Sequence, residues 1–143
     1  GTFETKDRQY VALGSLEDHF FENLCRAIDL PELAEEEKYN SWEKRCHHAR
    51  ELNRLIQDEI RKKTLDEWLV IFLNYDVPSC KVIHIEEIPN VEVFKERKLL
   101  EDYGSIDEGE YFIKFPVKFE NIALQKNKQA PKLGEHNKKI IDK

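Results

Sequence analysis

The hydrophobic positions along this chain follow helical spacing in some segments and strand spacing in others. Residues 2–5 and 9–13 are β-prone runs on either side of a polar turn at 6–8, which predicts a β-hairpin. From Leu16 to about residue 29, apolar side chains recur every three or four positions, which predicts an amphipathic helix. Ser15 is placed to cap this helix, because a serine hydroxyl accepts a hydrogen bond from a free backbone N–H of the first turn.

A second apolar stripe predicts one long helix from about residue 41 to about residue 62. Asn40 and Glu43 have the spacing of a capping box at its start. The stripe consists of Trp42, Cys46, Ala49, Leu52, Leu55, Ile56 and Ile60. Thr64 and Glu67 form a second capping box, which predicts a short apolar helix directly after it. The segment between the first two helices, residues 31–39, reads as a polar connector with an acidic run.

The C-terminal part of the chain predicts shorter elements. Alternation indicates strands at 81–85 and 111–119, although Pro116 restricts the latter to a sheet edge or to two shorter strands. Short helices are predicted at 84–88, at 91–100 and from Gly134 to the end, with a polar loop at 121–129. The predicted fold class is α+β, with several helices packed on a small mixed or antiparallel sheet.

Length and composition favour one globular domain over residues 1–143 and exclude several functional classes. The net charge of −6 disfavours nucleic-acid binding, because phosphate recognition needs a positive surface. No apolar run has the roughly 20 residues of a membrane span. The three cysteines form no closely spaced pair, so we expect a reducing, cytoplasmic location, and Cys25 and Cys46 are interpreted as small core residues on apolar helical faces.

Glu17 is the candidate functional residue. It follows the turn at Gly14 and falls in the first turn of the first predicted helix. The positive end of the helix dipole favours an ionised carboxylate there, which is also why acidic residues are common at such positions without any function. On residues alone, that structural explanation is the more frequent one.

Three stretches together resemble family III CoA-transferases, the CaiB/BaiF superfamily, and most of all its α-methylacyl-CoA racemases. They are residues 10–21 (YVALGSLEDHFF), residues 63–69 with 76–82 (KTLDEWL and DVPSCKV), and residues 130–136 (APKLGEH). In the racemases the first stretch carries a strand through a glycine to a glutamate of the catalytic site. The resemblance covers nearly the whole chain in order and spacing. It implies the small domain of that fold, with the large CoA-binding domain absent and encoded upstream.

The resemblance also implies a function for Glu17. A racemase removes the α-proton of an acyl-CoA thioester from one face and returns a proton to the other. The histidine and aspartate that do this would lie upstream, and Glu17 would orient the histidine by accepting a hydrogen bond. The resemblance implies coenzyme A thioesters as substrates of a homodimeric full enzyme, no cofactor bound by this fragment, and an inactive isolated chain.

Two alternatives remain open on the sequence. Racemases often have proline directly after this glutamate, whereas this chain has Asp18, which weakens the choice of racemase over CoA transfer between carboxylic acids. The other alternative is a non-catalytic interaction module that docks through the acidic connector and the long helix.

A metal site is not expected. His47 and His48 are adjacent, with Cys46, Glu43 and Glu51 nearby in sequence. Neighbouring residues of a helix point about 100 degrees apart, so the two imidazoles cannot share an ion without further ligands.

Overall fold

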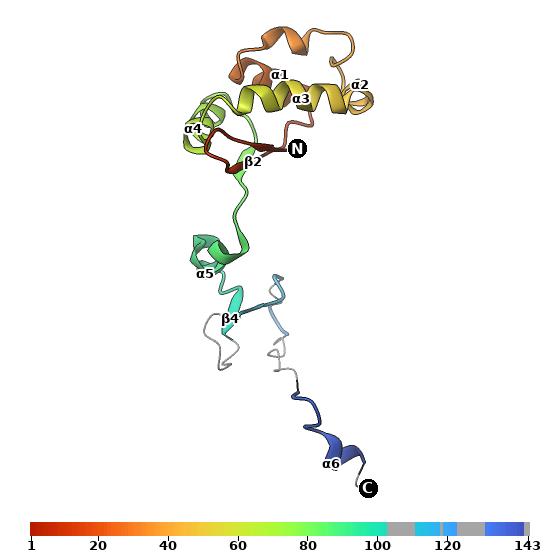
Figure 1. The fold of residues 1–143 in the computed structure, drawn as a ribbon, viewed down its shortest axis with the longest axis vertical. Coiled ribbons are helices and arrows are strands. Elements are labelled where there is room, and N and C mark those ends of the chain that lie inside the picture. Colours follow the sequence, from red (N-terminus) through yellow and green to blue (C-terminus); the bar gives the residue numbers. More distant parts are fainter. Residues whose placement is uncertain (103–110, 118, 123–130, 142–143) are drawn as a thin grey trace. The chain divides into compact units, whose positions relative to one another are not determined.

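In the computed structural model, the described residues are 1–102, 111–117, 119–122 and 131–141. The chain divides into two compact units, Gly1–Ile83 and His84–Lys143. The first unit contains the predicted hairpin and the long helices (Figure 1). Each unit is described separately below.

The first unit contains an antiparallel sheet of β1 (Thr2–Glu4), β2 (Tyr10–Leu13) and β3 (Ser79–Lys81), in that order. The predicted hairpin is confirmed, with Phe3 opposite Val11 and Arg8 at a φ of 59° in its turn. The third strand covers Ser79–Lys81 instead of the predicted 81–85, so the prediction is wrong at both ends. Pairing with β2 starts directly after the proline, where the Gly14 amide donates to the Pro78 carbonyl at 2.8 Å.

The first helix, α1 (Asp18–Ala27), starts later than predicted. Glu17 occupies the N-cap position with extended backbone angles, and its side chain makes no capping hydrogen bond. The prediction that Ser15 caps the helix is therefore wrong. The helix ends before Asp29, which has a φ of 61°, and Pro31 prevents its continuation.

The long predicted helix is broken into α2 (Trp42–His47) and α3 (Ala49–Ile60). The break lies at His48, whose backbone angles are −106° and 16°. Ser41, not Asn40, caps α2 by accepting from the Lys44 amide at 3.5 Å. The stripe is not buried along its whole length, since Trp42 at the start of α2 is 50% exposed.

The connector between α1 and α2, predicted to be polar, contributes side chains to the hydrophobic core. It contains a 3-10 helix, η1 (Pro31–Ala34), and it buries two large side chains, Leu33 and Tyr39. Acidic side chains surround these two anchors in the sequence, which hides the apolar contribution of the segment.

The α4 helix (Leu65–Asn74) starts as the sequence predicts. Thr64 accepts from the Glu67 amide at 3.4 Å, and the Thr64 amide donates to the Glu67 carboxylate at 2.8 Å. Trp68 stacks on Phe72 and donates through Nε1 to the Ile60 carbonyl at 2.7 Å. The core of the first unit consists of residues from all its layers: Phe3, Val11, Leu13, Phe21, Leu24, Cys25, Ala27, Ile28, Leu33, Tyr39, Leu52, Ile56, Ile60, Leu65, Trp68, Phe72 and Val77.

The second unit consists of short elements. They are η2 (Ile85–Asn90), α5 (Glu92–Glu96), β4 (Leu100–Asp102), β5 (Tyr111–Ile113) and α6 (Asn137–Ile140). Strands β4 and β5 pair antiparallel, with Leu100 opposite Ile113. None of the described residues of this unit is buried.

Several predictions for the second unit are wrong in extent. The helix predicted at 91–100 ends at Glu96, because Lys98 adopts a φ of 52° and the chain then enters β4, which was not predicted. The strand predicted at 111–119 ends at Ile113, three residues before Pro116. The terminal helix begins at Asn137, not Gly134, and most of the loop predicted at 121–129 lies outside the described residues. The fold class is α+β with antiparallel sheets, which confirms the predicted class.

Candidate functional site

Glu17 lies on the short turn that connects β2 to α1. The Leu16 amide donates to the Gly14 carbonyl at 2.9 Å, and the Glu17 carbonyl accepts from Phe21 as the first bond of the helix. The Glu17 side chain is exposed, and it makes no hydrogen bond or ion pair with the described part of the chain. A fixed backbone thus carries a carboxylate that is available to another group.

Arg45 holds this turn from the side of α2, and the sequence did not single it out. Its Nη2 atom donates to the Leu16 carbonyl at 2.8 Å and to Asp18 Oδ1 at 2.7 Å. Its Nη1 atom donates to the Tyr39 carbonyl at 3.0 Å, and the guanidinium carbon lies 4.5 Å from the centre of the Phe21 ring. One buried cation therefore joins α2, the connector and both neighbours of Glu17.

Exposed apolar surface adjoins the Glu17 carboxylate. An open hollow is lined by Leu16, Glu17, Asp18 and Trp42. Leu16 is 53% exposed and Trp42 is 50% exposed, so two large apolar side chains border the open hollow. The hollow therefore offers an apolar surface and a carboxylate to another segment or a substrate.

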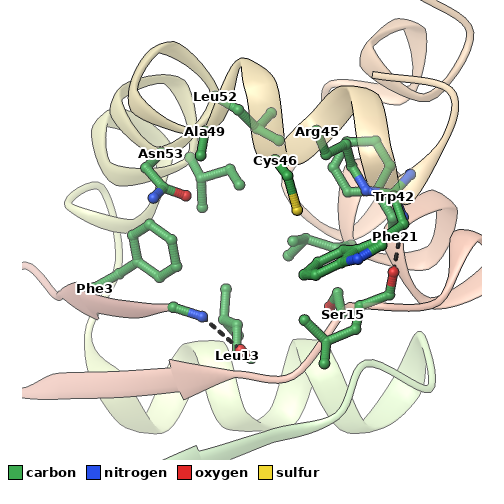
Figure 2. Close-up of a pocket in the computed structure, with 14 residues that line it drawn as sticks. Phe3, Leu13, Ser15, Phe21, Trp42, Arg45, Cys46, Ala49, Leu52 and Asn53 are labelled. Atoms are coloured by element: carbon green, nitrogen blue, oxygen red, sulfur yellow. Dashed lines mark hydrogen bonds between the residues drawn. The ribbon is translucent and has the colours of Figure 1, made fainter. Parts of the chain in front are cut away.

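A deeper pocket of about 210 Å³, drawn in Figure 2, shares lining residues with this hollow. It is lined by Gly1, Phe3, Leu13, Ser15, Leu16, Phe21, Leu24, Trp42, Arg45, Cys46, Ala49, Leu52, Asn53 and Ile56. Ser15 lies at its wall, and the Ser15 hydroxyl is buried with no hydrogen-bond partner among the residues that the structure describes. The pocket and the hollow share Leu16 and Trp42, so the two cavities meet beside the Glu17 turn.

The cysteines do not all behave as the sequence predicts. Cys25 is buried as predicted, and burial raises the pKa of its thiol to about 12. Cys46 is exposed, which corrects its interpretation as a core residue, because its side chain lies at the wall of the open pocket that Trp42 and Ala49 also line (Figure 2).

His48 of the adjacent histidine pair is engaged in local contacts. His48 Nδ1 lies 3.0 Å from the Lys44 carbonyl, and Glu51 pairs with Lys38 Nζ at 2.7 Å. The Lys38 hydrogen bond lowers the pKa of Glu51 below its ordinary value of 4.5. Across the described ranges, no group of three or more His, Cys, Asp or Glu side chains is arranged to hold a metal ion. No helix of the same residues is both long and apolar enough to cross a bilayer.

The sequence of this chain matches a known protein family over most of its length. The sequence profile described as CoA-transferase family III matches residues 1–137. The chain belongs to CoA-transferase family III. This family membership confirms the resemblance drawn from the three sequence stretches.

Characterised relatives within the family include both transferases and a racemase. The chain is 24% identical over 143 residues to (R)-2-hydroxy-4-methylpentanoate CoA-transferase of Clostridioides difficile, covering 98% of this chain and 36% of the relative. It is 26% identical over 144 residues to human alpha-methylacyl-CoA racemase, covering 99% of this chain and 35% of the relative. The chain thus spans about a third of the length of these relatives.

Solved structures share the fold. The crystal structure of Rv3272 from Mycobacterium tuberculosis matches with a TM-score of 0.69 at 21% identity, over 95% of this chain and 38% of that one. A CAIB/BAIF family protein from Brucella suis matches with a TM-score of 0.66 at 22% identity, over 97% of this chain and 35% of that one. The α+β arrangement is that of family III proteins.

Proposed function

We propose that this chain is the small domain of an acyl-CoA enzyme, in which it supplies Glu17 to an active site completed by a CoA-binding domain. The observation that carries this proposal is the exposed Glu17 carboxylate on the β2–α1 turn, bordered by the exposed Leu16 and Trp42. The share of about a third of each relative supports a role as one part of a larger protein. The homodimer expected from the resemblance belongs to the same proposal.

The reaction that we propose is racemisation of α-methylacyl-CoA thioesters by 1,1-proton transfer. One group of the CoA-binding domain removes the α-proton, leaving an enolate whose charge lies on the thioester oxygen. A second group delivers a proton to the opposite face of the same carbon, so the substrate composition is unchanged and only the configuration differs. The likeness of residues 10–21 to the racemase motif and the relationship to human alpha-methylacyl-CoA racemase support this reaction.

In this proposal Glu17 acts on the histidine rather than on the substrate carbon. An ionised carboxylate that accepts the imidazole N–H fixes the tautomer of the ring and stabilises its protonated form. The position of Glu17 at the start of α1 suits that charge, because the helix dipole favours an anion there. The isolated 143-residue chain should show no racemisation and no CoA transfer, since it would lack the acid/base pair.

The direct test substitutes Glu17 in the full-length polypeptide that contains this chain. Glu17→Gln should lower kcat about 10- to 100-fold, because the amide cannot stabilise a protonated imidazole. Glu22→Gln is the matched control, since Glu22 is an exposed glutamate one turn into α1 that lies outside the hollow. An unchanged kcat in Glu17→Gln would remove Glu17 from the active site.

CoA transfer between carboxylic acids is the second candidate. Two relatives favour it: the Clostridioides difficile transferase, and human succinyl-CoA:glutarate CoA-transferase, which is 27% identical over 146 residues. The two reactions separate in heavy water. A racemase incorporates deuterium at the α-carbon of an acyl-CoA without any acceptor acid, whereas a transferase forms a new thioester only when a second carboxylic acid is present.

A further inference from the structure

Arg45 is a charged side chain that the proposed reaction does not use, yet it is only 5% exposed. Charged side chains are rarely buried unless each donor has a partner. Its partners are not spread at random over the core. Two of the three lie on the residues directly before and after Glu17, namely the Leu16 carbonyl and the Asp18 carboxylate.

We propose that Arg45 is a positioning residue for Glu17, holding the β2–α1 turn so that the carboxylate keeps the orientation that the active site requires. This inference rests on the proposed function of Glu17. Arg45 itself makes no ion pair with Glu17 in the described structure, so it acts through the backbone and Asp18 and leaves the Glu17 carboxylate free.

Arg45 fixes the turn more firmly than a single ion pair would, because one guanidinium donates hydrogen bonds to three residues. The Nη2 atom binds Leu16 at 2.8 Å and Asp18 at 2.7 Å, which fixes the turn on both sides of Glu17. The Nη1 atom anchors the same guanidinium to Tyr39 at 3.0 Å, and the plane rests near the Phe21 ring (Figure 2). Lysine keeps the charge but presents a single ammonium group, so it cannot reproduce this planar set of bonds.

The turn needs this support because its own capping is weak. Glu17 occupies the N-cap position without a side-chain capping hydrogen bond, and the Ser15 hydroxyl has no hydrogen-bond partner in the described part of the chain. Local side chains therefore do not fix the start of α1. The distant guanidinium on α2 does so instead.

The test is a double-mutant cycle in the full-length polypeptide, measuring kcat, KM and the thermal midpoint for wild type, Arg45→Lys, Glu17→Gln and the double variant. Arg45→Lys should lower kcat about tenfold and change KM less than about twofold, because only the orientation of Glu17 is lost. In the Glu17→Gln background, Arg45→Lys should cause no further decrease in kcat. Arg61→Lys is the matched control, since Arg61 pairs with Glu4 at 3.2 Å on the surface.

The cycle distinguishes positioning from a merely structural role. If Arg45→Lys only reduces the amount of folded enzyme, it lowers kcat by the same factor in both backgrounds, and the inference is overturned. It is also overturned if Glu17→Gln lowers kcat but Arg45→Lys does not. An unchanged kcat in Glu17→Gln contradicts the proposed function of Glu17, and the inference about Arg45 then fails with it.

A second variant covers the case in which Arg45→Lys does not fold. Asp18→Asn removes the charge of one partner, while the Arg45 bonds to Leu16 and Tyr39 remain possible. It should lower kcat less than Arg45→Lys, by about threefold, and again only when Glu17 is present. Equal decreases in both backgrounds would contradict the inference.

Discussion

The starts of α1 and α4 are built in opposite ways within the same unit. The start of α4 is local, because Thr64 and Glu67 satisfy each other's backbone amides from three residues apart. The start of α1 has no side-chain cap, and its turn is held by Arg45, 27 residues from Asp18 along the chain. Helix α4, with its local cap, follows directly after α3 and carries no candidate site residue at its start. Helix α1, anchored by Arg45, begins at the candidate functional carboxylate of Glu17. The difference teaches that the exposed acid is placed by tertiary structure.

The largest effect on stability should come from removing the distant anchor. Arg45→Met leaves the buried Tyr39 carbonyl and the partly buried Leu16 carbonyl without their donor, and a buried acceptor left unpaired costs about 1–3 kcal/mol. The Asp18 pair adds little, because Asp18 is 60% exposed and solvent screens it. We expect the free energy of unfolding in urea to fall by about 2–3 kcal/mol. Arg61→Met, which alters a surface pair, should change it by less than about 0.5 kcal/mol.

Removing the local cap should cost less. Thr64→Ala deletes the hydroxyl that accepts from the Glu67 amide, and loss of such a cap costs about 1 kcal/mol. Urea denaturation of this variant beside Arg45→Met measures the comparison directly. A larger loss in Thr64→Ala than in Arg45→Met would reverse the proposed order of the two anchors.

The local cap should also depend on pH. Hydrogen bonds from Thr64 lower the pKa of Glu67 below its ordinary value of 4.5, so the folded protein binds a proton on Glu67 less readily than the unfolded chain. The contribution of Glu67 to stability is then present above the unfolded pKa and is lost as the pH falls through the folded pKa. The difference in thermal midpoint between wild type and Glu67→Gln should shrink between about pH 6 and about pH 3. A difference that stays constant over this interval would contradict the assigned role of the carboxylate.

The smallest perturbation is thiol labelling, which tests the exposure of the three cysteines in the folded protein. Cys46 and Cys80 are exposed and should react with a maleimide in the folded protein. Cys25 should not react, because it is buried and the pKa of its thiol is raised to about 12 by that burial. Mass spectrometry of the labelled protein gives the sites. Protection of Cys46 would contradict its place at the wall of an open pocket and would favour the core position that the sequence predicts.

Sequence reasoning succeeded where the determining residues are close together. The hairpin, the capping box at Thr64 and the burial of Trp68 all follow from spacings of a few residues. It failed where distant contacts decide. The apolar stripe through Cys46 conceals the break at His48, and nothing in the sequence near Arg45 indicates its bonds to Leu16 and Asp18. Glu17 was found through the family motif, whereas Arg45 required the structure.

The central claim is that Glu17 contributes to catalysis in an acyl-CoA active site. The most direct measurement is the rate of α-deuterium incorporation into an α-methylacyl-CoA thioester in heavy water by the full-length polypeptide. Glu17→Gln should slow this exchange about 10- to 100-fold, while Glu22→Gln leaves it unchanged. Exchange at the wild-type rate in correctly folded Glu17→Gln would contradict the account.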